Sequence, residues 1–297
     1  MRLYNHNTLI KRVFLIFIFL FPLIAFAQEK KESASKPETE FVEGTFHNLV
    51  LINNQTTDIL EKKEIEFSFQ QRFGNIRNDI DMFGIYAISN LRLGLDYGIT
   101  DRISIGAGIS RCNHTGDLNL KILMFRQNKS GAMPVTVAYF GEVTRNGSAH
   151  DDFINDKGEY DPVDRISYFH ELLMSRKFTE RLTLQGAVTY SYFNFTEAEK
   201  NNGNLGLSFL GRYKICRETS VILDFDYPIT QPEKKSIKPN LGIGLEFAAK
   251  NNQVQIFITT SSALVNDELR VSTQNDFTKT EFLLGFNISR KWDLKSK

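Results

Sequence analysis

The sequence predicts an all-β fold: a closed, up-and-down antiparallel transmembrane β-barrel of about twelve strands. Three observations support this prediction. Apolar and polar residues alternate in one segment after another, the connections between these segments are short and long in turn, and the polar face of the segments contains glycine. Strict alternation over several residues is typical of a strand whose two faces meet different environments.

The N-terminus is expected to be an export signal. Lys11 and Arg12 precede a short apolar run, and the small-residue sequence Ala-Phe-Ala follows at 25–27. These three parts are typical of a secretory signal peptide. A membrane anchor is the alternative, but the apolar run has roughly 15 residues, and a spanning helix needs about 20. We therefore expect residues 1–27 to be a signal peptide cleaved before Gln28.

Residues 28–62 are expected to form a flexible periplasmic N-terminal segment, with the barrel over 63–297. The stretch 28–40 is charged, contains Ser, Ala and Pro and has no periodicity, which is typical of a tether. One apolar cluster at 49–52 stands out after it. It predicts either a short strand or a segment packed at an opening of the barrel.

From residue 64 onward, period-two alternation defines the candidate strands. No amphipathic helix of convincing length competes with them. The candidate strands cover 64–73, 89–99, 102–110, 117–125, 134–143, 166–178, 181–193, 204–213, 220–227, 241–247, 253–259 and 280–292.

The connections between these strands alternate in length. Tight connections lie at 100–102, 179–181, 216–219 and 249–252, with a somewhat longer one at 126–133. Short periplasmic turns and longer extracellular loops are typical of outer-membrane barrels, whereas a soluble sandwich has no reason to keep this order. The longer stretches are 74–88, 111–116, 144–165, 194–203, 228–240 and 260–279.

One face of each candidate strand is apolar, and the other is charged, polar or glycine. Glycine weakens strands, so a soluble sandwich or a lipocalin-like barrel, which is the alternative, explains the pattern less well. In a membrane barrel the apolar face meets lipid and the polar face lines the interior, or lumen. The residues expected to face the lumen are Glu66, Arg72, Arg92, Asp96, Gly106, Gly108, Asp117, Lys121 and Arg212.

Aromatic residues beside the short turns predict a belt at the membrane interface. Aromatic residues also favour strands in general, which is the alternative explanation. The belt candidates are Tyr97, Phe178, Tyr213, Phe247 and Trp292.

The topology also predicts the state of the two cysteines, Cys112 and Cys216. Cys112 follows an outward-running strand, and Cys216 lies in a short turn at the opposite rim. The apolar band between the rims is about 25 Å tall, and a disulfide needs Cα atoms within about 7 Å. We therefore expect two free thiols.

Several segments resemble an uncharacterised family of Bacteroidota outer-membrane β-barrel proteins, domain of unknown function family 5777. The resemblance covers about residues 45 to 294. It implies a barrel in the outer membrane of a Gram-negative bacterium, and it implies no activity. One departure is the tail 293–297 after Trp292, since such barrels usually end on an aromatic residue. The segments are QQRFGNI at 70–76, RLGLDYGITDRISIGAG at 92–108, MPVTV at 133–137, RKF at 176–178 and GFNISRKW at 285–292.

Candidate chemistry is sparse. His170 is the only histidine within a candidate strand, with Ser167 and Ser175 nearby, but alternation places His170 on the lipid side. The acidic loop 144–165 lacks the EF-hand spacing, so a solvated loop is expected rather than a calcium site. No glycine-rich phosphate loop, C-x-x-C or H-E-x-x-H sequence occurs. We expect no catalytic residue, metal or cofactor.

The leading hypothesis is a non-enzymatic outer-membrane barrel that forms a narrow channel for small solutes. The alternative is a structural or interaction barrel that docks a periplasmic or surface protein, and a weaker one is a lipid-modifying barrel enzyme centred on His170. The mixed signs of the lumen charges fit either a closed interior or a polar path. The expected partners are outer-membrane lipid and the barrel-assembly machinery. With a formal net charge of +1, nucleic acid is not expected.

Overall fold

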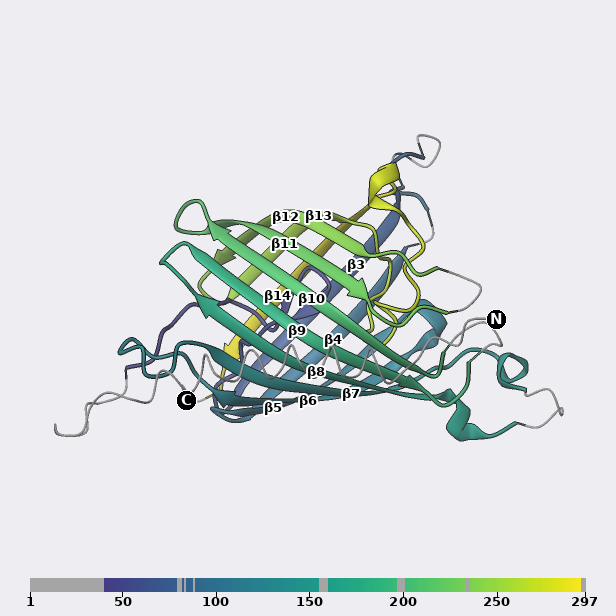
Figure 1. The fold of residues 1–297 in the computed structure, drawn as a ribbon, viewed down its shortest axis with the longest axis horizontal. Helices are drawn as coiled ribbons and strands as arrows, with labels where there is room; N and C mark the ends of the chain where they lie inside the picture. Colours follow the sequence, from purple (N-terminus) through teal and green to yellow (C-terminus); the bar gives the residue numbers. More distant parts are fainter. Residues whose placement is uncertain are drawn as a thin grey trace, which may run out of the picture.

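The computed structural model forms a closed barrel of twelve antiparallel strands, β3 to β14, as the sequence predicts (Figure 1). The signal peptide expected at 1–27 and the tether that follows it lie outside the described residues. The structure describes residues 40–78, 82, 84–87, 89–154, 160–196, 201–232 and 236–294.

Each predicted segment forms one barrel strand, and the strand ends lie within three residues of the predicted ends. The strands are β3 (Glu64–Asn75), β4 (Asn90–Thr100), β5 (Ile103–Ser110), β6 (Gly116–Phe125), β7 (Thr136–Arg145), β8 (Ile166–Lys177), β9 (Leu182–Phe193), β10 (Gly203–Lys214), β11 (Thr219–Pro228), β12 (Asn240–Ala249), β13 (Asn252–Thr259) and β14 (Leu283–Asp293).

The barrel closes where its first strand, β3, pairs with its last strand, β14. In this register Trp292 lies opposite Ile65, and Ile65 lies opposite Tyr97 on β4. Every other strand pairs with its neighbours along the chain. A closed sheet leaves no strand edge unpaired, which is what hydrocarbon requires because it offers no water to backbone groups.

The described parts of the longer connections contain four short 3₁₀ helices. Among the described residues, no helix has the length and apolar character needed to cross a bilayer. The 3₁₀ helices are η1 (Cys112–His114), η2 (His150–Phe153), η3 (Pro162–Arg165) and η4 (Phe277–Lys279).

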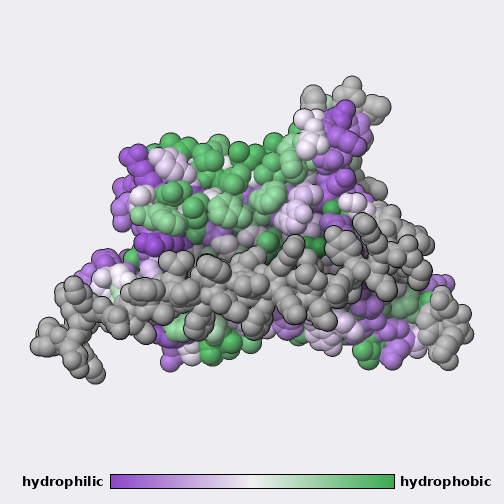
Figure 2. Space-filling model, in the orientation of Figure 1, coloured by the Kyte–Doolittle hydropathy of each residue, from purple (hydrophilic) through white to green (hydrophobic). Residues whose placement is uncertain are grey.

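The outer surface of the barrel wall is apolar. Ile109 and Leu118, on adjacent strands, are 64% and 66% exposed. Figure 2 shows hydrophobic residues across the visible wall and hydrophilic residues toward the strand ends. The five belt candidates are also exposed, and each lies at or beside the short-turn end of its strand: Tyr97, Phe178, Tyr213, Phe247 and Trp292.

Two segments fold into the barrel from opposite ends. The first, residues 46–60, is called the N-terminal insert and contains a small hairpin of β1 (Val50–Leu51) and β2 (Asn54–Gln55). The second, residues 260–282, joins β13 to β14 and is called the infolded loop. Both segments contain largely buried side chains.

The N-terminal insert corrects one sequence-based expectation. The expectation of a flexible periplasmic segment over 28–62 was wrong for residues 46–60, because these residues are folded inside the barrel. Leu51, Ile52 and Leu60 are at most 1% exposed. The apolar cluster therefore packs in the interior, and burying it there removes it from water.

The two cysteines are free and exposed. Cys112 lies in η1, and Cys216 lies in the short turn between β10 and β11 at the opposite rim. The prediction of two free thiols is confirmed.

Replacing Gly108 with Ala tests the packing of the inner wall. A Cβ at Gly108 would lie 2.4 Å from Arg92 Nη2 and 2.5 Å from Asp117 Oδ2. We expect Gly108→Ala to lower the free energy of unfolding by about 1–3 kcal/mol, since those atoms must move. Urea unfolding of the refolded protein in micelles measures the change.

Gly186→Ala is the matched control, because a Cβ there meets only Ser208 O, at 3.9 Å. Its unfolding free energy is expected to stay within about 0.5 kcal/mol of the wild type. Equal stability of the two variants would contradict the described packing around Gly108.

Candidate functional site

The candidate site is the lumen, and the structure places the predicted lumen-facing side chains on its inner wall. Two glycines of this set make room for side chains: a Cβ on Gly106 would collide with Asp96, and one on Gly108 with Arg92. Asp96 is half-buried. The other charged members are at most 5% exposed: Glu66, Arg72, Arg92, Asp117, Lys121 and Arg212.

Some of these charges pair with each other along the wall. Arg92 Nη2 lies 2.6 Å from Asp117 Oδ1, on strands two apart in the sheet. Arg212 on β10 likewise pairs with Glu246 on β12. In such buried, hydrogen-bonded pairs each partner satisfies the other's charge, and each pair links two strands across the strand that lies between them.

Other wall charges hold the N-terminal insert. Arg72 Nη2 donates to Ile52 O at 2.8 Å. Lys121 Nζ donates to Leu49 O at 3.2 Å, and Lys291 Nζ lies 2.8 Å from Asp58 Oδ2. The insert is thus bonded to β3 and β14 on one side of β4 and β5, and to β6 on the other side.

The tip of the insert contacts the far wall. Asn54 Nδ2 donates to Asp224 Oδ1 at 2.6 Å and to Asp226 Oδ1 at 3.0 Å. Asn53 Nδ2 donates to Asp224 Oδ2 and to Thr259 Oγ1, both at 2.9 Å. Asn54 and Asp224 are almost fully buried. The hairpin therefore crosses the lumen and joins opposite parts of the wall.

Apolar side chains of the wall pack against apolar side chains of the insert, an arrangement that the alternation of residues did not predict. Leu210, Ile222 and Phe257 point inward and pack with Leu51 and Ile52 in one buried cluster. A second buried cluster contains an insert residue, Ile59, and residues of β6 to β9: Leu123, Ala138, Phe140, Phe169, Leu173 and Ala187. A water-filled lumen would not favour such side chains. Large apolar residues at inward-facing positions were the available sign of a filled interior.

The infolded loop reaches the same place from the other end. Asn266 Nδ2 donates to Glu142 Oε2 at 2.8 Å, and Ser167 Oγ donates to Asp267 Oδ2 at 2.5 Å. Arg270 Nη2 lies 2.8 Å from Asp226 Oδ1 and also donates to Asn54 Oδ1. Arg270 and Asn54 thus join the infolded loop to the N-terminal insert in the middle of the lumen.

Burial changes two titratable groups of these segments. It lowers the pKa of His47 to about 4, and the positive charge of Arg212 adds to the effect. His47 is therefore neutral at pH 7. Burial raises the pKa of Asp267 to about 6, while the hydrogen bond from Ser167 acts in the opposite direction.

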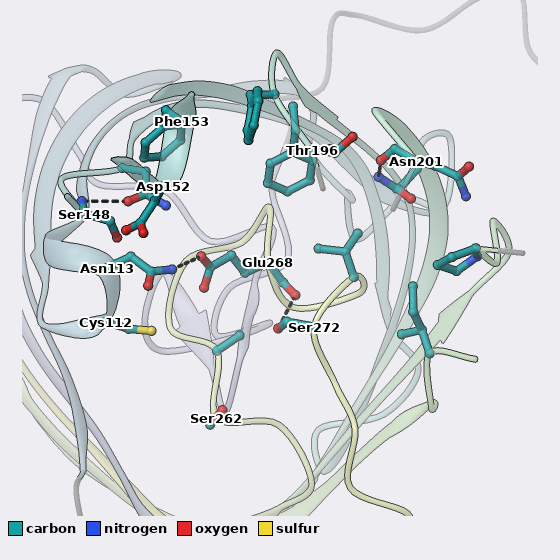
Figure 3. Close-up of a pocket in the computed structure, with 18 of the residues that line it drawn as sticks. Cys112, Asn113, Ser148, Asp152, Phe153, Thr196, Asn201, Ser262, Glu268 and Ser272 are labelled. Atoms are coloured by element: carbon teal, nitrogen blue, oxygen red, sulfur yellow. Dashed lines mark hydrogen bonds between the residues drawn. The ribbon is translucent and has the colours of Figure 1, made fainter. Parts of the chain in front are cut away.

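A cavity lies at each end of the filled region. The larger, called the outer cavity, has a volume of about 530 Å³ and opens among the longer connections (Figure 3). The smaller, called the inner cavity, has a volume of about 270 Å³ and lies at the short-turn end beside Glu43, Asp58 and Lys291. The N-terminal insert and the infolded loop separate the two.

The candidate enzyme residues are not assembled into a site. Ser167 and Ser175 are buried on the inner wall, whereas His170 is exposed on the outer face, where its Nδ1 lies 2.6 Å from Tyr139 Oη. No serine–histidine pair forms from these three residues. Within the acidic loop, Asp156 and Glu159 lie outside the described residues. Among the described residues, no group of His, Cys, Asp and Glu is arranged to hold a metal ion.

A family model described as a membrane-bound β-barrel domain, DUF5777, matches residues 46–292. The chain belongs to the DUF5777 family. The match begins at the first residue of the N-terminal insert, so the insert is part of the DUF5777 domain. The protein is a membrane-bound β-barrel.

The chain is similar to several solved structures at low sequence identity. A KdgM porin is 7% identical, with a TM-score of 0.46 over 77% of this chain and 98% of that one. An outer membrane channel from Pseudomonas putida F1 is 12% identical, with a TM-score of 0.46 over 79% and 97%. OmpF of Salmonella typhi is 6% identical, with a TM-score of 0.37 over 77% and 97%. No curated protein matches the chain.

Replacing Asn54 with Ala tests how the insert is held. The change leaves Asp224 and Asp226 without the amide donor of Asn54 in a buried region. A buried group without its partner costs about 1–3 kcal/mol. We therefore expect backbone amides of residues 46–60 to exchange with deuterium roughly tenfold faster or more, measured by mass spectrometry.

Asn202→Ala is the matched control, because Asn202 also donates a hydrogen bond, to Phe193 O, but lies in an exposed connection. Its insert should exchange at the wild-type rate. Unchanged protection of the insert in Asn54→Ala would show that the polar tip does not hold it.

Proposed function

We propose that the protein is a non-enzymatic outer-membrane barrel that forms a narrow channel for small solutes, closed by its N-terminal insert. The observation that carries this proposal is the set of polar contacts between the insert and the wall. Asn53, Asn54 and the backbone of Ile52 are held by side chains of the wall, between a cavity at each end. The insert is the part that would move when the channel opens.

The chemistry of the contacts suits a removable plug. A hydrogen bond between the insert and a charged side chain of the wall is worth only about 1.5–3 kcal/mol net, because water replaces it when the insert leaves. The wall carboxylates and guanidinium groups would then face water, which is their preferred surrounding. Withdrawal of the insert would leave an intact sheet, since the strand ladders do not involve the insert. The lining would then carry charged side chains together with an apolar patch that includes Ile222 and Phe257.

The charge of the wall sets the expected selectivity. The buried charged side chains of the strands are seven carboxylates and four cations. A pore with this lining attracts cations and repels anions. The carboxylates are Glu66, Asp117, Glu142, Glu171, Asp224, Asp226 and Glu246, and the cations are Arg72, Arg92, Lys121 and Arg212.

The proposed location is the outer membrane of a Gram-negative bacterium of the Bacteroidota. Export by the signal peptide, insertion by the barrel-assembly machinery and contact of the aromatic belt with lipid belong to this proposal. The exposed apolar wall and the match to a membrane-bound barrel family support it.

A second candidate is an interaction barrel that docks a periplasmic protein. One observation favours it: the segment just before the insert lies along the short-turn rim. Val42 N donates to Gln127 O at 2.9 Å, Lys129 N donates to Glu40 O at 2.9 Å, and Phe41 is 38% exposed. A partner bound to this segment would be placed to pull on the insert.

Removing the insert tests the channel. We expect the full-length protein to conduct weakly in planar bilayers. A variant with residues 46–60 replaced by a Gly-Ser linker should give steady, ohmic conductance, because the space that the N-terminal insert fills becomes open and the infolded loop alone remains in the lumen. In a salt gradient its reversal potential should show a preference for cations.

The Asn54→Ala variant keeps the whole chain and weakens the hold on the insert, so we expect its conductance to lie between those of the wild type and the insert variant. Asn202→Ala is the control and should conduct like the wild type. Folding of each variant is checked by circular dichroism and by its gel mobility before and after heating. A folded insert variant that stays closed would contradict the channel. If the same variant instead loses a periplasmic protein that co-purifies with the wild type, the interaction barrel is supported.

A further inference from the structure

The outer cavity has a lining that suits one class of ligand. Its described walls come from η1, η2 and the β9–β10 connection, and its floor comes from the infolded loop. In Figure 3, Asp152 and Phe153 stand on one side, Asn201 stands on the other, and Glu268 lies between them on the infolded loop. A volume of about 530 Å³ is within the range of small-molecule sites.

Side-chain amides are the main polar groups of this cavity. Asn113 Nδ2 donates to Glu268 Oε1 at 3.1 Å, and among the described residues its Oδ1 has no donor. Asn146 Oδ1 accepts from Ser148 N at 2.9 Å, and its Nδ2 has no acceptor within the same part of the chain. One amide therefore offers an acceptor and the other offers donors. A ligand with hydroxyl groups, which both donate and accept, matches this mixture.

Three phenylalanines supply an apolar surface beside the amides. Phe153, Phe193 and Phe195 line the outer cavity, and the rings of Phe153 and Phe195 are 5.7 Å apart. Phe193 and Phe195 are partly exposed. The face of an aromatic ring carries negative charge density, so it attracts the weakly positive C–H groups on the flat side of a sugar ring.

The charged residues of the outer cavity disfavour anionic ligands. Asp152 and Glu268 are acidic, and none of the described lining residues is basic. An anionic ligand would therefore meet like charge with no cation to pair with. Glu268 already accepts a hydrogen bond from Asn113, so one of its oxygens is engaged without a ligand cation.

We propose that the outer cavity is a binding site for a neutral saccharide. The sugar ring lies against the phenylalanine face, and its hydroxyls bond to Asn113 and Asn146. A neutral peptide is a poorer match, because its backbone presents no flat C–H face rimmed by hydroxyls. The site is independent of the channel, because it does not require the N-terminal insert to move.

Cys112 provides a direct readout, because it lines the outer cavity and the only other cysteine, Cys216, lies at the opposite rim. In a Cys216→Ser background, N-ethylmaleimide can modify only Cys112. Burial and the charge of Glu268 raise the pKa of the Cys112 thiol, so the reaction is slow and is followed for long times near neutral pH, where a maleimide stays selective for thiols. The full mature chain in micelles is used, and the rate is followed by mass spectrometry.

The probes are four trimers of different chemistry. Maltotriose and cellotriose are neutral saccharides, trigalacturonate is an anionic one, and trialanine is a neutral peptide. We expect a neutral trisaccharide to slow the alkylation of Cys112, by about tenfold at ten times its Kd. Trigalacturonate and trialanine should leave the rate unchanged at the same concentration.

Phe195→Ala should abolish this protection, because it removes one aromatic face of the outer cavity. Phe178→Ala is the matched control, since Phe178 is an exposed aromatic residue beside the short turn at the opposite rim. It should keep full protection and the same basal alkylation rate.

Three results would overturn the proposal. The first is no protection by either neutral saccharide, and the second is equal or stronger protection by trigalacturonate or trialanine. The third is protection that survives in Phe195→Ala. The readout does not depend on conductance, so failure of the channel and failure of the saccharide site are separate outcomes.

Discussion

The pairing of β3 with β14 is the contact on which the rest of the structure depends. These strands are the first and the last of the sheet, and their ladder runs from Glu64 opposite Asp293 to Asn75 opposite Leu283. Without this pairing the sheet would have two edges of unsatisfied backbone groups, which hydrocarbon does not tolerate. Closure also separates an inside from an outside. Because side chains alternate between the two faces of each strand, one row then faces lipid and the next faces the lumen.

Closure creates an interior that must itself be filled or wetted. The wall carries charges such as Arg72 and Asp224 beside apolar side chains such as Ile222 and Phe257. Water alone would suit the charges and not the apolar residues. The N-terminal insert serves both, because its backbone and asparagines bond to the charges while Leu51 and Ile52 pack on the apolar patch. The mixed character of the inner wall is thus complementary to the insert.

Local pattern predicted the wall of the barrel well. The stretch 91–110 alone shows two strands joined by a tight turn, with Leu and Ile in the outward row and Ser104, Gly106 and Gly108 in the inward row. These features are set by neighbours along the chain and by the two-residue period of a strand. The predicted strands accordingly lie within three residues of the observed ones.

The filling of the lumen could not be predicted in the same way. Arg270 meets Asn54 across 216 positions of sequence, and no spacing rule connects them. The inward-facing Phe140, Phe169 and Phe257 carried the missing information, because a polar pore has no use for them. These phenylalanines indicate a filled lumen only after the inward face of each strand has been assigned, and that assignment requires the barrel to be predicted first.

The path of the N-terminal insert has a topological consequence. The chain reaches it along the short-turn rim, where Val42 bonds to Gln127, and leaves it at the same rim, where Lys63 bonds to Gly98. The insert is therefore a finger pushed in and folded back, and it is never threaded from one opening to the other. Such a finger can slide out and return without passing a chain end through the barrel and without breaking a strand pair. Removal is in principle reversible, and the sheet can close before or after the finger enters.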